Sequence, residues 1–466
     1  MNKITTPPAF PRPAFVEEGR RALEELLSRQ PGIREIDALL IDINGIPRGK
    51  RFPVTESDRL FNSGMQIPQS IYLMDPRGEM TNPFGRGIGD GDPDGTAWPL
   101  PSTIRPVWCE GPPRAQVLMT MRDQDGACHP AEPRGAVERV IERFAGSGLV
   151  PVVALELEFY LIDLQRDSQG APQPPRDPRT GARESAHAVY EADDLDRYAG
   201  FLSGLNEAAA FQGLPLTATS SEYGPGQFEA NLRHGPDPAA AADDSIFLKQ
   251  IVKAAARSAG YDATFMAKPY LLRAGSGLHA HVSVLDAKGR NIFDDGSELG
   301  SESLHHAIGG LQASMPESMA IFAPSVNSYR RFQPDMFAPV NRRWGVNNRS
   351  VGLRVPIGPP DSRRVEHRAA GADANPYLVL AAVLAGVHSG IERRIDPGAP
   401  AAGNVSRLSD AGLPLTIDDA LARMSDAELL KDYFGEEAVA LYRESKRLEL
   451  QRFRGIVSPA EYEWYV

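Results

Sequence analysis

Two glutamates, Glu156 and Glu158, lie two positions apart in the otherwise apolar run ALELEFYLID. In a β-strand, side chains at positions i and i+2 leave by the same face. Both carboxylates would therefore point into one space, and burying two like charges together is costly unless cations neutralise them. By itself the pair fits a solvated edge strand as well as a cation site. Other segments of the chain are needed to distinguish these two interpretations.

Two further segments carry groups that bind cations. TSSEYGPGQFEANL places Glu222 and Glu229 on either side of a Gly-Pro-Gly turn. GSGLHAHVSV alternates His279, His281 and Ser283 along one face of a predicted strand. A lone histidine is more often structural than a ligand, so only the combination of these segments indicates a cation site.

Arginine is concentrated between positions 327 and 368, at 330, 331, 342, 343, 349, 354, 363, 364 and 368. These nine arginines face only three acids and no lysine, which gives a local charge of +6 in a chain of net charge −11. An arginine-only cluster suits bidentate binding of carboxylate or phosphate, whereas a solvated basic face would normally include lysine. Arg364, Glu366 and Arg368 alternate on one strand face, which is also typical of a structural ion-pair ladder. Arg349 and Arg354 lie just upstream of these three residues. We interpret the whole cluster as an anion-binding site.

Together these segments supply five glutamates and one or two histidines beside the arginines. Oxygen-dominated ligation without thiolate favours Mg²⁺ or Mn²⁺ over zinc or copper. Such cations beside arginines are what phosphoryl transfer needs, because both neutralise charge on phosphate oxygens. The sequence has no G-x-x-x-x-G-K-[ST] segment and no kinase-type catalytic loop, so a nucleotide would be bound in another way.

Strands alternating with long helices are expected to position these residues. An amphipathic helix around Leu23 and Leu26 is followed by a hairpin over 36–54, with Asn44-Gly45 as a two-residue turn. We predict loops over 82–113 and 163–186, and a strand over 115–121. Helices are predicted from Pro133 to Gly146 and over 193–212, 238–259, 301–321, 375–393 and 415–452.

Composition narrows the class of protein. A chain of 466 residues with 42% hydrophobic residues can bury a sizeable core in two or three domains. The net charge of −11 argues against nucleic-acid binding, and no apolar run approaches the roughly 18 residues of a membrane span. With no apolar secretion signal and only two cysteines, we expect a cytoplasmic protein that contacts neither membrane nor nucleic acid.

Five ordered segments resemble the motifs of the glutamine synthetase family. ALELEFYLID resembles its E-x-E metal strand, and SEYGPGQFE its second pair of metal glutamates. FMAKPYLLRAGSGLHAHVS is similar to its K-P…G-S-G-x-H-x-H segment. The stretch from APSVNSYRRF to SVGLRVP resembles its N-S-Y-x-R…N-R-S…R-x-P signature, and RRVEHRAAGADANPYL its R-R-x-E-x-R…A-N-P-Y segment.

The resemblance implies an α+β architecture. It comprises an N-terminal arm and helix (1–30), a β-grasp domain (31–128) and a catalytic domain (129–466). The catalytic domain would contain an incomplete antiparallel β-barrel flanked by helices. The resemblance also implies a ring homo-oligomer, commonly a dodecamer of two stacked rings.

Residue roles follow by motif position. Glu158, Glu222 and Glu229 would bind one Mg²⁺ or Mn²⁺, and Glu156, His279 and Glu366 a second on the phosphates of ATP. L-Glutamate would be bound by Gly275, Arg331 and Arg368, beside Glu158 and Glu222. Phosphates would be held by Arg349, Arg354 and Arg364, with Arg349 and Arg354 in catalytic roles. His281 and Ser283 would face the nucleotide.

The departures from the family pattern concern the amine. Ammonia-using members read P-G-[YF]-E-A-P after N-S-Y-x-R, and here Phe337 stands at the glutamate position. Their F-D-G-S-S motif is also missing, and Ala274 replaces the asparagine before G-S-G. Phe337 would make the amine pocket more apolar. We therefore expect an ATP-dependent ligase that joins the γ-carboxylate of L-glutamate to a small organic amine through γ-glutamyl phosphate. Such an enzyme would be similar to γ-glutamylputrescine synthetases and their relatives in amine catabolism or nitrogen assimilation. The alternatives are an ammonia-using glutamine synthetase, with Asp335 replacing the missing acid, and a non-catalytic structural or regulatory paralogue.

Overall fold

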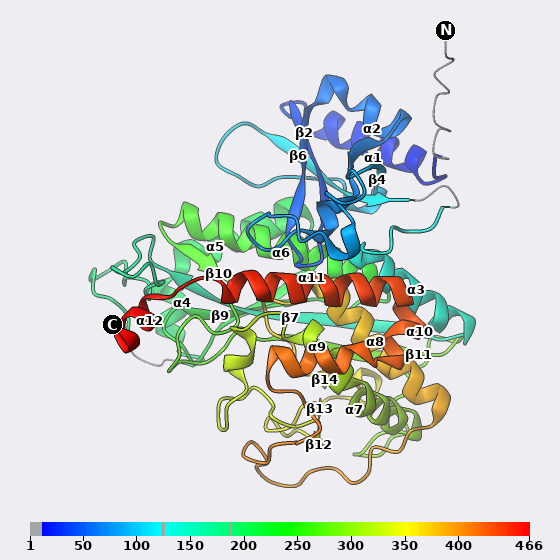
Figure 1. Ribbon diagram of the computed structural model, residues 1–466, viewed down its shortest axis with the longest axis vertical. Helices are drawn as coiled ribbons and strands as arrows, with labels where there is room; N and C mark the ends of the chain where they lie inside the picture. The colour runs from blue at the N-terminus through cyan, green and yellow to red at the C-terminus, as the bar shows by residue number, and fades with distance from the viewer. Residues whose placement is uncertain (1–11, 123–125, 186–188) are drawn as a thin grey trace. The chain divides into compact units, whose positions relative to one another are not determined.

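The structure is a computed structural model that describes residues 12–122, 126–185 and 189–466 (Figure 1). The chain divides into two compact units, Met1–Gly135 and Ala136–Val466. Both mix helices with a sheet, so the α+β class is confirmed.

Within its described residues, the first unit contains a six-stranded sheet of order β2-β1-β6-β4-β3, with β5 paired to β6. The bounds are β1 Glu35–Ile41, β2 Pro47–Pro53, β3 Met65–Pro68, β4 Asp94–Pro99, β5 Arg105–Pro106 and β6 Arg114–Met121. The predicted amphipathic helix is α1 (Val16–Arg29), which buries Leu23 and Leu26, and α2 covers Asp58–Asn62.

Two predictions for this unit were wrong. The hairpin joining β1 to β2 has five connecting residues, 42–46, in place of a two-residue turn. Its geometry is set by Asp42, whose Oδ1 accepts hydrogen bonds from the backbone N–H groups of Asn44 and Ile46, both at 2.9 Å. The region expected to be all loop contains β4, because the buried segment DGTAWP pairs with β6 despite its Gly- and Asp-rich surroundings.

The second unit is built on an eight-stranded sheet of order β12-β13-β14-β11-β7-β9-β8, with β10 paired to β7, within the residues described (Figure 1). The bounds are β7 Val150–Ile162, β8 Leu216–Ser221, β9 Gln227–Leu232, β10 Asp262–Thr264, β11 Leu278–Leu285, β12 Trp344–Val346, β13 Leu353–Val355 and β14 Val365–His367. All neighbours are antiparallel except β12 and β13, which are parallel. Along β7, Leu155, Leu157 and Phe159 are fully buried, and alternation turns Glu156 and Glu158 to the opposite face.

Helices surround this sheet, at α3 Pro133–Gly146, α4 Ala192–Arg197, α5 Ala199–Gln212, α6 Pro238–Ser258, α7 Glu302–Phe322, α8 Pro376–Arg393, α9 Ile417–Ser425, α10 Glu428–Phe434, α11 Glu436–Arg454 and α12 Pro459–Tyr465. The helix predicted over 193–212 is divided at Tyr198. The one predicted over 415–452 is three helices, because the chain leaves helical geometry at Asp426–Ala427 and at Gly435, whose φ is +89°. No helix in the described ranges is long and apolar enough to cross a membrane.

Candidate active site

Strand register brings the chemistry-bearing segments together on one face of the sheet. Glu156 on β7 lies opposite His279 on β11, and Glu158 lies opposite Glu229 on β9. On the far side of β11, Glu366 of β14 lies opposite His281 and, across the next pair, opposite Arg354. Segments far apart in the sequence thus become neighbours through hydrogen-bonded strand pairs.

A cavity of about 590 Å³ opens over this face. Of the residues predicted for metals, glutamate, phosphates and the amine, it is lined by Glu156, Glu158, Glu222, Glu229, Gly275, His279, Arg331, Phe337, Arg349, Arg354, Glu366 and Arg368. A second cavity of about 730 Å³ is lined by the remaining three, His281, Ser283 and Arg364. Glu156 lines both cavities, so β7 lies at their common wall.

Two triplets in the first cavity have the spacing of cation ligands. In the first, ligand atoms of Glu156, His279 and Glu366 all lie within 4.8 Å of one another. In the second, the same holds for Glu158, Glu229 and His279. Glu222 lines the cavity and belongs to neither triplet, so the second set has His279 where the family pattern implies Glu222.

The charges of these glutamates support a cation at this place. Burial, followed by repulsion from Glu158 and Glu229, raises the pKa of Glu222 to about 8. Burial and repulsion from Glu156 and Glu158 raise the pKa of Glu229 to about 8 as well. Half-buried carboxylates that repel one another ionise readily only beside a cation, and oxygen-rich sites of this kind suit Mg²⁺ or Mn²⁺.

This electrostatic conflict predicts a pH-dependent effect of Mg²⁺ on stability. Because the folded-state pKa values of Glu222 and Glu229 lie above the ordinary 4.5, the folded protein holds more protons than the unfolded chain between about pH 4.5 and 8. Stability in EDTA should therefore fall as pH rises through this range, and Mg²⁺ should raise the melting temperature more at pH 8 than at pH 6. Thermal unfolding with EDTA or Mg²⁺ at pH 6, 7 and 8 tests this, and an equal gain at all three would contradict it.

Glu156 is held ionised by two histidines. Its Oε1 lies 2.8 Å from His281 Nε2, and its Oε2 lies 3.4 Å from His279 Nδ1. Burial raises the pKa of Glu156, but the two imidazoles outweigh burial and hold this pKa below its ordinary value. Arg364 donates its Nε–H to His281 Nδ1 at 3.2 Å, so the imidazole of His281 lies between this arginine and Glu156.

Glu366 joins two of the arginines. Its Oε2 accepts a hydrogen bond from Arg354 at 2.8 Å, and its Oε1 is paired with Arg368. Burial opposes ionisation of Glu366, yet Arg368 foremost among its neighbours lowers its pKa to about 2. The Nε–H groups of Arg331, Arg354 and Arg368 are buried without a hydrogen-bond partner among the described residues, and the side chains of all three arginines line the cavity, where guanidinium groups suit carboxylate or phosphate oxygens.

The arginine cluster does not act as one unit. Five of its nine members line the two cavities, at 331, 349, 354, 364 and 368. Arg342 pairs with Asp410 at 2.7 Å, and Arg363 donates to the carbonyls of Ser297 and Glu298. Arg330 and Arg343 are exposed outside both cavities. The interpretation of the whole cluster as an anion site was therefore too broad.

The glycine loop before β11 is shaped by the arginine that it approaches. A Cβ atom on Gly275 would lie 2.7 Å from Arg331 Cγ and 2.9 Å from the Ala267 carbonyl oxygen. Gln227 of the Gly-Pro-Gly segment donates its Nε2–H to the Gly275 carbonyl at 3.0 Å. Only glycine permits this approach, which places Arg331 against the backbone of the loop.

Aromatic side chains also line this cavity. The ring of Phe337 is half exposed and lies 5.2 Å, centroid to centroid, from the ring of Tyr223. Tyr190 lines the same cavity, where its side chain contacts Arg349. Asp335 points elsewhere, because its carboxylate binds Ser406 Oγ and Arg407 Nε, both at 2.7 Å. Asp335 is not among the residues that line the first cavity, but it lines a smaller cavity of about 300 Å³ together with Phe337.

Some cavity residues escaped prediction. Asn231 lines both cavities and lies two positions after Glu229, so the i, i+2 rule applied to β9 would have found it. Tyr190 and Tyr223 lie in turns, where no sequence periodicity indicates which way a side chain points.

Residues 130–465 match the glutamine synthetase catalytic domain. The chain therefore belongs to the glutamine synthetase family, whose members are C–N bond-forming enzymes. It is 41% identical to the γ-glutamylputrescine synthetase PuuA of Escherichia coli (strain K12), over 97% of this chain and 94% of that protein. It is 31% identical to the γ-glutamylethanolamide synthetase GlnA4 of Streptomyces coelicolor, over 92% of each. The solved structure of GmaS with ADP superposes with a TM-score of 0.79 at 28% identity, covering 94% of this chain and 98% of that one.

Proposed function

We propose that this protein is an ATP-dependent ligase that forms a γ-glutamyl amide from L-glutamate and a small organic amine. The observation that carries the proposal is the cavity itself, whose lining combines carboxylates and arginines with the neighbouring rings of Phe337 and Tyr223. The relatives that act on putrescine and ethanolamine support it.

The reaction has two steps, and each step forms one bond and breaks another. The γ-carboxylate of glutamate attacks the γ-phosphorus of ATP, which releases ADP and gives γ-glutamyl phosphate. The amine nitrogen then attacks the acyl carbon, inorganic phosphate leaves, and the amine loses a proton. Mg²⁺ or Mn²⁺, two or three per site, would supply Lewis-acid neutralisation of the phosphate oxygens.

The residues of the chain divide this work between them. Arg331 and Arg368 would bind the α-carboxylate of glutamate beside Gly275, Glu158 and Glu222. Arg349 and Arg354 would neutralise charge that develops on the transferred phosphoryl group. His281, Ser283 and Arg364 would bind ATP in the second cavity. Glu156, Glu158, Glu222, Glu229, His279 and Glu366 would hold the cations.

At the acceptor end, the rings of Phe337 and Tyr223 would contact the carbon atoms of the amine, or its ammonium group through their π faces. An amine with an apolar substituent therefore fits this end better than ammonia. In the family's terms, residues 31–128 would be the β-grasp domain, 1–30 its arm and helix, and 129–466 the catalytic domain with an incomplete barrel.

The acting form would be a cytoplasmic ring homo-oligomer, a dodecamer. Exposed apolar residues near the C-terminus support self-association, because they would otherwise face water: Phe453, Ile456, Val457, Tyr462, Trp464 and Tyr465. Light scattering of the purified protein would give its mass, and a monomer would exclude the ring.

ADP release with glutamate, ATP and Mg²⁺ over putrescine, ethanolamine, isopropylamine and ammonia tests the function. We expect the best organic amine to exceed ammonia in kcat/KM by at least about tenfold, from about 1.4 kcal/mol of apolar contact. Equal turnover with ammonia would make the protein an ordinary glutamine synthetase. Absence of both turnover and Mg²⁺-dependent ADP binding would indicate a non-catalytic paralogue.

A further inference from the structure

The loop over 163–185 contacts two segments that carry cavity-lining residues. Pro175 packs against Gly226, where a Cβ atom would lie 2.5 Å from Pro175 Cγ, and Gly226 belongs to the turn between Glu222 and Glu229. The carbonyl of Ser185 accepts a hydrogen bond from Arg273 Nη2 at 3.0 Å. Arg273 is two positions before Gly275, so the loop contacts both backbone segments that shape the glutamate end of the cavity.

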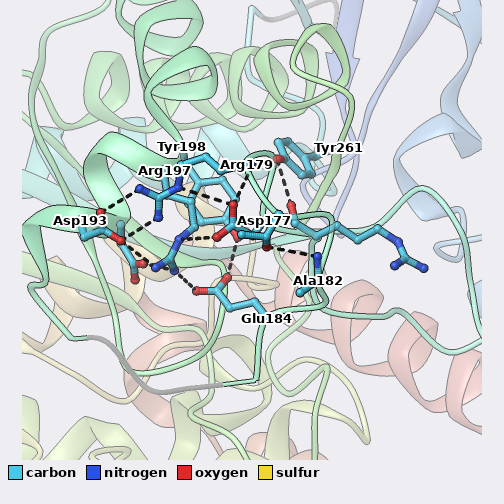
Figure 2. A network of polar contacts seen from close by, with 11 residues as sticks. Asp177, Arg179, Ala182, Glu184, Asp193, Arg197, Tyr198 and Tyr261 are labelled. Atoms are coloured by element: carbon cyan, nitrogen blue, oxygen red, sulfur yellow. Dashed lines mark hydrogen bonds and ion pairs between the residues drawn. The ribbon is translucent and has the colours of Figure 1, made fainter.

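Arg197, the last residue of α4, pairs with carboxylates of this loop (Figure 2). The guanidinium of Arg197 lies 3.3 Å from Asp177 and 2.9 Å from Glu184, both in the loop. It also pairs with Asp193, at 2.9 Å, and with Asp194, both in α4. The side chains of Arg197, Glu184 and Asp194 are no more than 16% exposed, so these contacts are screened far less than surface ion pairs.

Tyr198 and Arg179 complete the network around Arg197 (Figure 2). The hydroxyl of Tyr198 donates to Glu184 Oε2 at 2.6 Å, and its ring packs edge-on against Phe228 of β9, with centroids 5.6 Å apart. Arg179 forms a bidentate pair with Asp193 at 2.8 and 2.9 Å, on the exposed side of the network. Arg197 therefore contacts both the loop and the aspartates of α4, on the less exposed side of the network.

Helix α4 begins two positions after Tyr190, which lines the cavity and contacts Arg349. The backbone N–H of Tyr190 donates to the Ser221 carbonyl at 3.2 Å, directly before Glu222. Its φ of +57° is unusual for a tyrosine, so surrounding contacts must hold the segment in place. The contacts of Arg197 with Asp193 and Asp194 fix the start of the helix that follows.

We propose that Arg197 is a positioning residue for the acceptor and glutamate end of the active site. Arg197 holds the 163–185 loop against α4 as a clamp. The position of α4 sets that of Tyr190, and the position of the loop sets those of the Glu222 turn and of the segment before Gly275. The nucleotide cavity is lined by none of these elements, so its affinity for ADP should be independent of the clamp. The inference rests on the proposed function only in naming glutamate and amine as the ligands.

The test is Arg197→Lys, which keeps the charge and loses the planar fork that meets four carboxylates. We expect the KM values for glutamate and amine to rise at least about tenfold and the calorimetric Kd for glutamate, with ADP and Mg²⁺ present, to rise equally. The Kd for ADP should stay within about threefold of wild type. Arg166→Gln is the matched control and should stay within about twofold on every measure, because Arg166 is an exposed arginine of the same loop whose ion-pair partner, Asp262 at 3.9 Å, lies outside the network.

Two outcomes would overturn the proposal. One is an unchanged affinity for glutamate and amine in Arg197→Lys, and the other is an equal loss of ADP affinity, which indicates general damage. If Arg197→Lys does not fold, Tyr198→Phe takes its place, since it removes one hydrogen bond to Glu184 and should shift the same constants by a smaller factor. Glutamate binding can be measured without amine turnover. A wild-type protein inactive on amines would therefore refute the proposed function, while the Kd for glutamate in wild type and Arg197→Lys would still test the role of Arg197.

Discussion

Glu158→Gln should lower kcat by about 10³-fold, while the Kd for Mg²⁺–ADP stays within about threefold of wild type. The substitution removes one negative charge from the Glu158, Glu229 and His279 triplet, and several kcal/mol of charge neutralisation at the transferred phosphoryl group depend on it. The second cavity, where we propose that ATP binds, does not include Glu158, which is why ADP affinity should be spared. Steady-state kinetics and calorimetric ADP titrations measure the two effects.

Glu156→Gln is the matched control, two positions away on the same strand. Glu156 lines both cavities and belongs to the other triplet, so this variant should lose turnover and also weaken ADP binding by more than about tenfold. If both variants weakened ADP binding to the same extent, the assignment of the two glutamates to different cations would be wrong.

Phe337→Ala should lower kcat/KM for the best organic amine by about 10- to 100-fold and leave kcat/KM for ammonia within about threefold. Removing the ring takes away apolar contact worth about 1.5–3 kcal/mol with the carbon atoms of the amine, which ammonia never makes. Competition between the two amines, with both γ-glutamyl products quantified, measures the change in preference directly.

The control for this variant is Phe211→Ala, which removes a similarly exposed ring from α5 outside the cavities. It should leave amine preference unchanged. If Phe337→Ala also left the preference between organic amine and ammonia unchanged, the substrate would not contact this ring. Tyr190 and Tyr223 would then be the residues to vary.

The strand-borne part of the site could be predicted from sequence because alternation determines which face a side chain takes. Glu156 and Glu158, His279 and His281, and Glu366 were found in this way, and the structure places all five on the walls of two adjoining cavities. The family pattern then supplied roles that spacing alone does not contain. The long helices were also predictable, from apolar periodicity.

What escaped prediction depends on contacts between segments distant in the sequence. Nothing near Arg342 or Arg363 in the sequence shows that their partners are Asp410 and the 297–298 backbone, so both were wrongly included in the predicted anion-binding cluster. Gly435 and Tyr198 divide helices whose apolar pattern runs on without interruption. The clamp around Arg197 joins a loop to a helix through side chains alone, and no periodicity predicts such contacts.

The backbone of the acceptor end differs in kind from that of the carboxylate end. Tyr190, Asp335 and Phe337 have φ values of +57°, +62° and +57°, all in turns, while Glu156, Glu158, Glu229 and Glu366 are held by strand register. A strand residue cannot move without shifting its hydrogen-bonded neighbours, whereas a turn can exchange side chains and length locally. On the proposed function, the strand-held residues would serve the phosphorylation step and the turn residues would serve the acceptor. A change of nucleophile would need few substitutions in evolution, because it would leave the activation of glutamate untouched.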